Sequence, residues 1–150
     1  HGAAVRDRRV EPFAFTTNYV QVWCYDTEDN TCKLFKLSRI HAVELTDISW
    51  AHKADHQEGF LDLFRMHGER RYHIRLEVGL LAYNLLLEEF PLSERELTPA
   101  GKDRWVLDTW VAGLQGVGRL VVGLLDDIRI LEGDPLKEYL NDYMTQNRLK

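Results

Sequence analysis

Cysteine, methionine and proline are scarce in this chain of 150 residues, which has two, two and four of them respectively. No apolar run approaches the roughly 20 residues that a membrane-spanning helix needs. The first ten residues are polar and basic, unlike a signal peptide. Without a secretion signal, Cys24 and Cys32 are expected to stay reduced, although a hairpin loop between them would also allow a disulfide. These scarcities predict a cytoplasmic protein with no membrane segment.

An excess of positive charge is also lacking, since the formal net charge is -5. Residues 1–58 hold seven Lys and Arg against nine Asp and Glu, and residues 59–150 hold twelve against fifteen. Neither part has the basic surface that general binding to duplex DNA requires. Any anion site must therefore be local, and its candidates are Arg6, Arg8, Arg9, Lys36 and Arg39.

Signatures of catalysis, metal binding and cofactor binding are missing. His52 and His56 have helical metal-ligand spacing, but they lie in a polar stretch without a third ligand. Gly116 and Gly118 lack the third glycine of a dinucleotide fingerprint, because position 121 is Val. Two carboxylate pairs are expected at helix ends, facing solvent: Glu88-Glu89 and Asp126-Asp127. We expect no enzyme, no metal and no cofactor.

Short apolar strands joined by turns make up the first third of the chain. Val and aromatic residues favour strands, and we expect them at 9–15, 19–25, 32–37 and 40–45, with an acidic hairpin loop at 26–30. Several short strands with tight turns are typical of a small β-barrel. Residues 51–58 are polar and lack periodicity, so they are interpreted as a linker.

Strands and helices alternate in the remainder. A strand at 72–78 is followed by a helix at 80–90, a hairpin of 96–98 with 104–111, a helix at 114–125, a strand at 128–131 and a last helix from Asp134 to about 147. This order predicts a ferredoxin-like unit. One face of its sheet is expected to lack helices and to carry Trp105 or Trp110, which suits a dimer or domain interface.

Cationic and apolar residues alternate between Lys33 and Ile40. On a regular strand Lys36 and Arg39 would point to opposite faces, so a bend near Ser38 is needed to bring them together. Two such cations can hold a phosphate or carboxylate by charge-assisted hydrogen bonds. The alternative is a solvated strand edge that Lys and Arg protect from aggregation.

Several weak motifs, in order and at suitable spacing, resemble one family. Arg8-x-Val10-x-Pro12, the aromatic-rich stretch 19–26 and Phe35-Lys36-Leu37-Ser38-Arg39-Ile40 are similar to the WYL domain of bacterial transcription regulators. The stretches 72–76, 88–91 and 118–124 are similar to the C-terminal extension that follows it. The resemblance implies an α+β protein: a small Sm/SH3-like β-barrel without its first strand over residues 1–50, a linker over 51–58, and a ferredoxin-like extension over 59–150.

The resemblance also implies a function, which is ligand sensing and dimerisation for a helix-turn-helix regulator. The effector would be single-stranded DNA or an anionic nucleotide, and a separate helix-turn-helix domain would bind promoter DNA. The implied ligand-binding residues are Arg8, Gln21, Lys36 and Arg39. Gln21 stands where the family has an exposed tyrosine, and it can hydrogen-bond a base but cannot stack on one. The alternative is an oligomerisation or protein-docking module that binds no small ligand.

Overall fold

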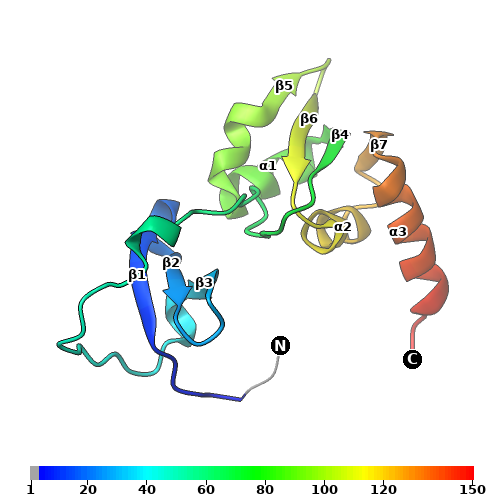
Figure 1. Ribbon diagram of the computed structural model, residues 1–150. Helices are drawn as coiled ribbons and strands as arrows, with labels where there is room; N and C mark the ends of the chain where they lie inside the picture. Colours follow the sequence, from blue (N-terminus) through cyan, green and yellow to red (C-terminus); the bar gives the residue numbers. More distant parts are fainter. Residues whose placement is uncertain (1–3) are drawn as a thin grey trace. The chain divides into compact units, whose positions relative to one another are not determined.

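The computed structural model describes residues 4–150, apart from the side chain of Asn18. It is an α+β protein whose chain divides after Gly59 into two compact units (Figure 1). A three-stranded antiparallel sheet forms the first unit, and a four-stranded antiparallel sheet with helices forms the second. In the described part of the chain, no helix is long and apolar enough to cross a membrane.

The first sheet has the strand order β1-β2-β3. Its strands are β1 (Val10–Phe15), β2 (Gln21–Asp26) and β3 (Thr31–Lys36). A 3-10 turn, η1 (Thr17–Tyr19), joins β1 to β2, and residues 27–30 form the predicted hairpin turn between β2 and β3. Every residue of the central strand β2 is buried. The three predicted strands before residue 38 are thus confirmed.

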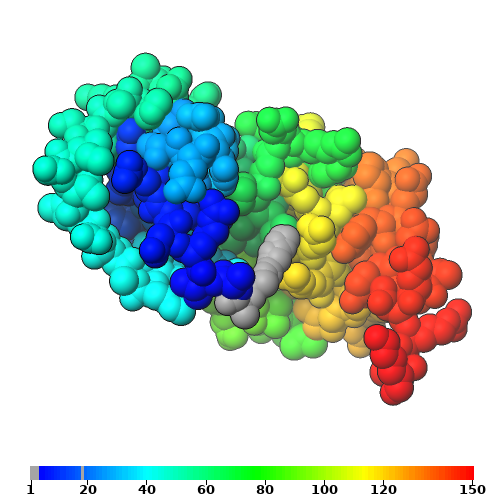
Figure 2. Space-filling model, turned by 60° about the horizontal axis from the view of Figure 1, so that its bottom comes forward, coloured from blue at the N-terminus to red at the C-terminus, as the bar shows by residue number. Residues whose placement is uncertain are grey.

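The predicted fourth strand at 40–45 is wrong, and no closed barrel is detected among the described residues. After β3 the chain makes a 3-10 turn, η2 (Leu37–Arg39), and then runs to residue 50 without regular structure. Figure 1 draws this segment as an open loop, and its cyan atoms lie at the surface in Figure 2. Val43 and Leu45 are 85% and 96% exposed. Alternating apolar residues favour a strand, but a strand also needs a neighbour for its hydrogen bonds and side chains.

Residues 51–58, interpreted as a linker, pack against the first sheet. The carboxylate of Glu11 in β1 accepts the backbone N–H of Ala51 and His52, at 3.1 and 3.2 Å, and lies 2.8 Å from His56 Nε2. The rings of His52 and His56 stack on Tyr25 and Phe13, with centroids 4.6 and 4.7 Å apart. The two histidines therefore hold this segment in place by packing.

The two cysteines are free, as preferred from the sequence. Cys32 pairs with Tyr25 across the hairpin, and Cys24 pairs with Lys33, so the cysteines are offset by one position on antiparallel strands. Neighbouring positions on a strand point to opposite faces, which keeps the two thiols apart. Burial, with a smaller contribution from Asp26, raises the pKa of the Cys24 thiol to about 11.

The second unit contains every strand and helix predicted after residue 70. Its sheet has the order β5-β6-β4-β7, with all neighbours antiparallel. A 3-10 helix, η4 (Pro91–Glu96), follows α1 at the predicted proline stop. The other elements are β4 (Tyr72–Gly79), α1 (Leu80–Glu89), β5 (Leu97–Pro99), β6 (Arg104–Val111), α2 (Leu114–Gly123), β7 (Ile128–Glu132) and α3 (Asp134–Gln146). Gly133 is the N-cap of α3.

The core of this unit lies between the sheet and its helices. Ile74, Leu76 and Val78 of β4 are fully buried, together with residues of α1, α2 and α3. The alternate residues of β4 and β6 lie on the opposite face, where Trp110 is 54% exposed. Trp105 instead stacks on Tyr83 of α1, with ring centroids 3.8 Å apart. Of the two tryptophans proposed for the bare face, the structure has only Trp110 there.

Candidate functional site

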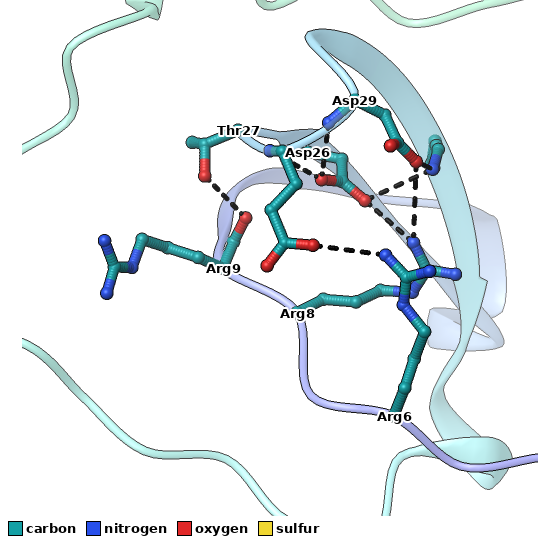
Figure 3. A network of polar contacts seen from close by, with 8 residues as sticks. Arg6, Arg8, Arg9, Asp26, Thr27 and Asp29 are labelled. Carbon is teal, nitrogen blue, oxygen red and sulfur yellow. Dashed lines mark hydrogen bonds and ion pairs between the residues drawn. The ribbon is translucent and has the colours of Figure 1, made fainter.

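The hairpin end of the first sheet is built around Asp26, whose side chain is fully buried. Its Oδ1 accepts the backbone N–H of Glu28 at 2.9 Å and of Asp29 at 3.2 Å, as in an Asx turn. Its Oδ2 lies 2.9 Å from Arg8 Nη1 and 3.2 Å from Lys33 Nζ. Figure 3 shows these bonds converging on the carboxylate from β1's leading segment and from the hairpin.

Burial by itself would raise the pKa of the Asp26 carboxyl, because the charged form loses water. The backbone N–H bonds of Asp29 and Glu28 and the side chains of Lys33 and Arg8 outweigh that effect and lower the pKa to about 2. Asp26 is therefore charged throughout the neutral range, and both cations are held by it.

Other ion pairs complete the charge balance at this end (Figure 3). Arg6 lies 3.1 Å from Glu28, and Asp29 lies 3.8 Å from Arg8 and also contacts Lys33. Three cations thus face three carboxylates, counting Asp26. Two of the predicted anion-site residues, Arg6 and Arg8, are neutralised within this network. The third, Arg9, lies at the same end, where its carbonyl accepts the N–H and hydroxyl of Thr27, and its exposed guanidinium has no ion pair within residues 4–150. Apart from Arg9, the cations of the hairpin end are already matched by carboxylates.

The opposite end of the same sheet is formed by the start of β2, the end of β3 and the turn η2. Gln21 pairs with Lys36 in register, and the Leu37 N–H donates to the Val20 carbonyl at 3.0 Å, which ties η2 to the start of β2. This 3-10 turn lies at Ser38, where a bend would be needed to bring Lys36 and Arg39 to one side. Such a turn breaks the strand alternation that would have sent Lys36 and Arg39 to opposite faces.

Lys36 and Arg39 are exposed, and neither side chain has an ion pair or hydrogen bond to another residue within 4–150. The chain segments that meet here, residues 15–23 and 34–41, contain these two cations and no carboxylate. This end of the sheet therefore carries a local positive charge on a protein whose net charge is negative.

The four predicted ligand residues do not form one cluster. Gln21 and Asp26 are five positions apart on β2, which at about 3.3 Å per residue separates the two ends by roughly 16 Å. Arg8 belongs to the Asp26 end, and its guanidinium lies 5.6 Å from the Phe35 ring centroid. Gln21 is at the same end as Lys36, but it is only 5% exposed. Lys36 and Arg39 are three residues apart at the other end of the sheet, and both are exposed to solvent.

Two exposed aromatic residues at this end were not among the predicted site residues. Phe15 ends β1 opposite Val22, and Tyr19 ends η1. Their exposed fractions are 57% and 72%, and their ring centroids are 5.5 Å apart. The sequence predicts the turn at 16–18 that joins β1 to β2. It does not show whether the aromatic rings before and after that turn point to the core or to solvent.

No group of three or more His, Cys, Asp or Glu within residues 4–150 is arranged to hold a metal ion. Comparison of the chain with models of known protein families and with curated proteins finds no match. The functional argument therefore rests on the sequence resemblance and on the geometry of the first sheet.

Proposed function

We propose that this chain is the ligand-sensing and dimerisation region of a bacterial helix-turn-helix transcription regulator of the WYL type. Its effector is single-stranded DNA or an anionic nucleotide, bound at the end of the first sheet by Lys36 and Arg39. The three-stranded sheet is the open part of an Sm/SH3-like barrel in this proposal. Promoter DNA is bound by a helix-turn-helix domain outside these 150 residues.

The observation that carries the proposal is the charge contrast between the two ends of one small sheet. At the hairpin end, Arg6, Arg8 and Lys33 are matched by carboxylates, and within residues 4–150 only Arg9 among the cations there has no ion pair. At the other end, Lys36 and Arg39 have no carboxylate within their neighbouring segments. A guanidinium and an ammonium with free donors can hold a phosphate, the guanidinium in a bidentate manner.

Arg8 and Gln21 take indirect roles in this proposal. The Arg8 guanidinium already pairs with the buried carboxylate of Asp26 through Nη1, which balances its charge, so it offers a phosphate less than an unpaired cation does. Arg8 therefore acts by keeping the hairpin and the leading segment in place. Gln21 pairs with Lys36 across the strands, so it fixes the position of that cation more than it reaches a ligand.

The second unit provides the dimer contacts in this proposal. Numbered within the unit, its strands lie in the order 2-3-1-4, which supports the ferredoxin-like interpretation. The sheet face without helices carries Trp110 and ion pairs such as Arg75 with Glu132, at 2.8 Å. Effector binding controls promoter binding only if the effector prefers one arrangement of the dimer over another.

The test is a titration of labelled oligothymidylate into the chain at 50 and 200 mM salt. Two phosphate contacts on a single strand predict an affinity that falls about sevenfold between these salt concentrations, from a slope of about -0.7 per contact. The double variant Lys36→Ala/Arg39→Ala should bind at least about tenfold more weakly, because charge-assisted hydrogen bonds are lost. Lys137→Ala/Arg119→Ala removes two exposed cations of the second unit and is the matched control. Equal binding by both double variants would refute the proposed site.

The alternative function, an oligomerisation or docking module without a small ligand, draws on the apolar side chains of residues 40–50. Val43, Leu45 and Ile48 are all more than half exposed there. Such apolar exposure is a common mark of a protein contact. A molar mass that rises with protein concentration, together with no response to oligonucleotide or nucleotide, would favour this alternative.

A further inference from the structure

We propose that residues 50–59 form a strap that leaves the first sheet when the carboxylate of Glu11 loses its charge. While Glu11 is charged, it holds the strap on the sheet. An open strap joins the irregular residues 40–49 as one flexible tether, which ends where the second unit begins. This inference goes beyond the proposed function, because it concerns the chain between the two units and does not depend on any ligand.

The strap is held on the sheet by side chains alone. Its backbone hydrogen bonds close a short 3-10 turn, η3 (Lys53–Asp55), and none of them joins the backbone of a strand within residues 4–150. Residues 41–47, which precede the strap, make no backbone hydrogen bond in the same part of the chain. A segment without such bonds can open locally while the sheet beneath it stays folded.

Glu11 makes the central contact of the strap. Its side chain is 8% exposed and accepts the backbone N–H groups of Ala51 and His52, while Oε1 lies 2.8 Å from His56 Nε2. Burial alone would raise the pKa of this carboxyl. The hydrogen bonds with His56 and with the two backbone N–H groups outweigh burial and lower the pKa below its ordinary value. Glu11 is therefore charged at neutral pH.

Ring packing and one thiol contact complete the hold on the strap. Besides the two histidine stacks on Tyr25 and Phe13, the Trp50 ring meets His56 edge-on, with centroids 4.7 Å apart. The Cys32 thiol donates to the Asp55 carbonyl at 3.2 Å. Phenol and thiol groups stay neutral in acid, so only carboxylates and imidazoles change charge there. The titratable groups around Glu11 are His52, Asp55 and His56 of the strap, Tyr25 of β2 and Cys32 of β3.

The direction of the pH effect follows from Glu11. Because its folded-state pKa is lowered, the stability that it contributes is present above its ordinary value of 4.5 and is lost as the pH falls through the folded-state pKa. Imidazole groups carry a proton in acid. His56, whose side chain is 7% exposed, is then a buried cation without its carboxylate, which is unfavourable. Both changes favour the open strap at low pH.

Gly59 offers a second way to open the strap, without a change of charge. A Cβ atom at this position would lie 2.9 Å from Cη2 of the Trp23 ring, so Gly59→Ala should push the end of the strap away from β2. A Cβ atom at Gly123 of α2 meets nothing within 4 Å, which makes Gly123→Ala the matched control.

The experiment is NMR on the isotopically labelled chain from pH 7 to pH 3, with heteronuclear NOE and amide exchange read at each residue. Glu11→Gln gives the uncharged state at pH 7. Its control is Glu28→Gln, which removes a carboxylate at the hairpin that is about half exposed and pairs with Arg6. The amides of β2 report whether the sheet stays folded.

We expect residues 51–58 of the original chain to be as rigid as β2 at pH 7 and to become mobile below about pH 4.5, while β2 stays protected. In Glu11→Gln the strap should be mobile already at pH 7, with amide exchange at Ala51 and His52 at least about tenfold faster, the factor that loss of one charge-assisted hydrogen bond provides. Gly59→Ala should also loosen the strap at pH 7, and both control variants should match the original chain.

Two results would overturn the proposal. One is a strap that stays as rigid in Glu11→Gln as in the original chain at pH 7. The other is a strap that loosens only together with β2, both in Glu11→Gln and in the original chain in acid, since the strap would then be an inseparable part of the first unit.

Discussion

Replacement of Asp26 by asparagine should destabilise the first unit in a manner that depends on pH. The variant keeps a carbonyl oxygen for the backbone N–H groups of Glu28 and Asp29 but removes the charge that binds Arg8 and Lys33. Lowering of the carboxyl pKa from 3.8 to about 2 corresponds to about 2 kcal/mol of folding free energy. We expect a loss of about that size at pH 7.

The sign of the pH dependence follows from the direction of the pKa change. Because the folded-state pKa of Asp26 is lowered, its contribution is fully present above the unfolded pKa, near 4, and is lost as the pH falls towards 2. The difference in unfolding free energy between the original chain and Asp26→Asn should therefore be constant from pH 5 to 7 and shrink between pH 4 and 2.

Urea unfolding, followed by the indole NMR signal of Trp23 in β2, measures this difference in the first unit. Asp29→Asn is the matched control, because its carboxylate meets the same two cations while about half exposed, and an exposed pair contributes under about 1 kcal/mol. Equal losses in the two variants, or a loss in Asp26→Asn that persists unchanged at pH 2, would refute the reasoning.

Other parts of the structure give further expectations. Glu11→Gln should speed amide hydrogen exchange at Ala51, because a neutral amide is a weaker acceptor than the carboxylate that holds residues 51–58; unchanged exchange would contradict this anchoring role. Trp105→Ala should cost about 3 kcal/mol in urea unfolding of the second unit, because the ring stacks on Tyr83. Trp110→Ala, on the exposed face, should cost under about 1 kcal/mol, and equal losses would contradict the assignment of faces.

The second unit was predictable because its elements have strong local signals. Alternation in residues 72–78 marks a half-buried strand, and Pro91 ends the helix that follows it. The choice between Trp105 and Trp110 was not predictable, since the turn and register of the β5–β6 hairpin decide which tryptophan faces the helices.

The first unit was less predictable because its structure depends on contacts between distant residues. Residues 51–58 have no periodicity, and they are ordered by Glu11, which lies about 40 positions away in the chain. Arg8 was predicted to bind an anionic ligand, but its guanidinium is already paired with the buried carboxylate of Asp26 on β2. Local sequence shows which residues are charged, whereas the register of the strands decides which charges are already matched.

The most direct test of the central claim is an NMR titration of the isotopically labelled chain with oligothymidylate, read residue by residue. The account predicts that amide signals of residues 19–21 and 36–39 shift in a saturable manner, while those of residues 26–31 at the hairpin end stay in place. Shifts centred on Asp26 and Arg8, or on the Trp110 face of the second sheet, would contradict it.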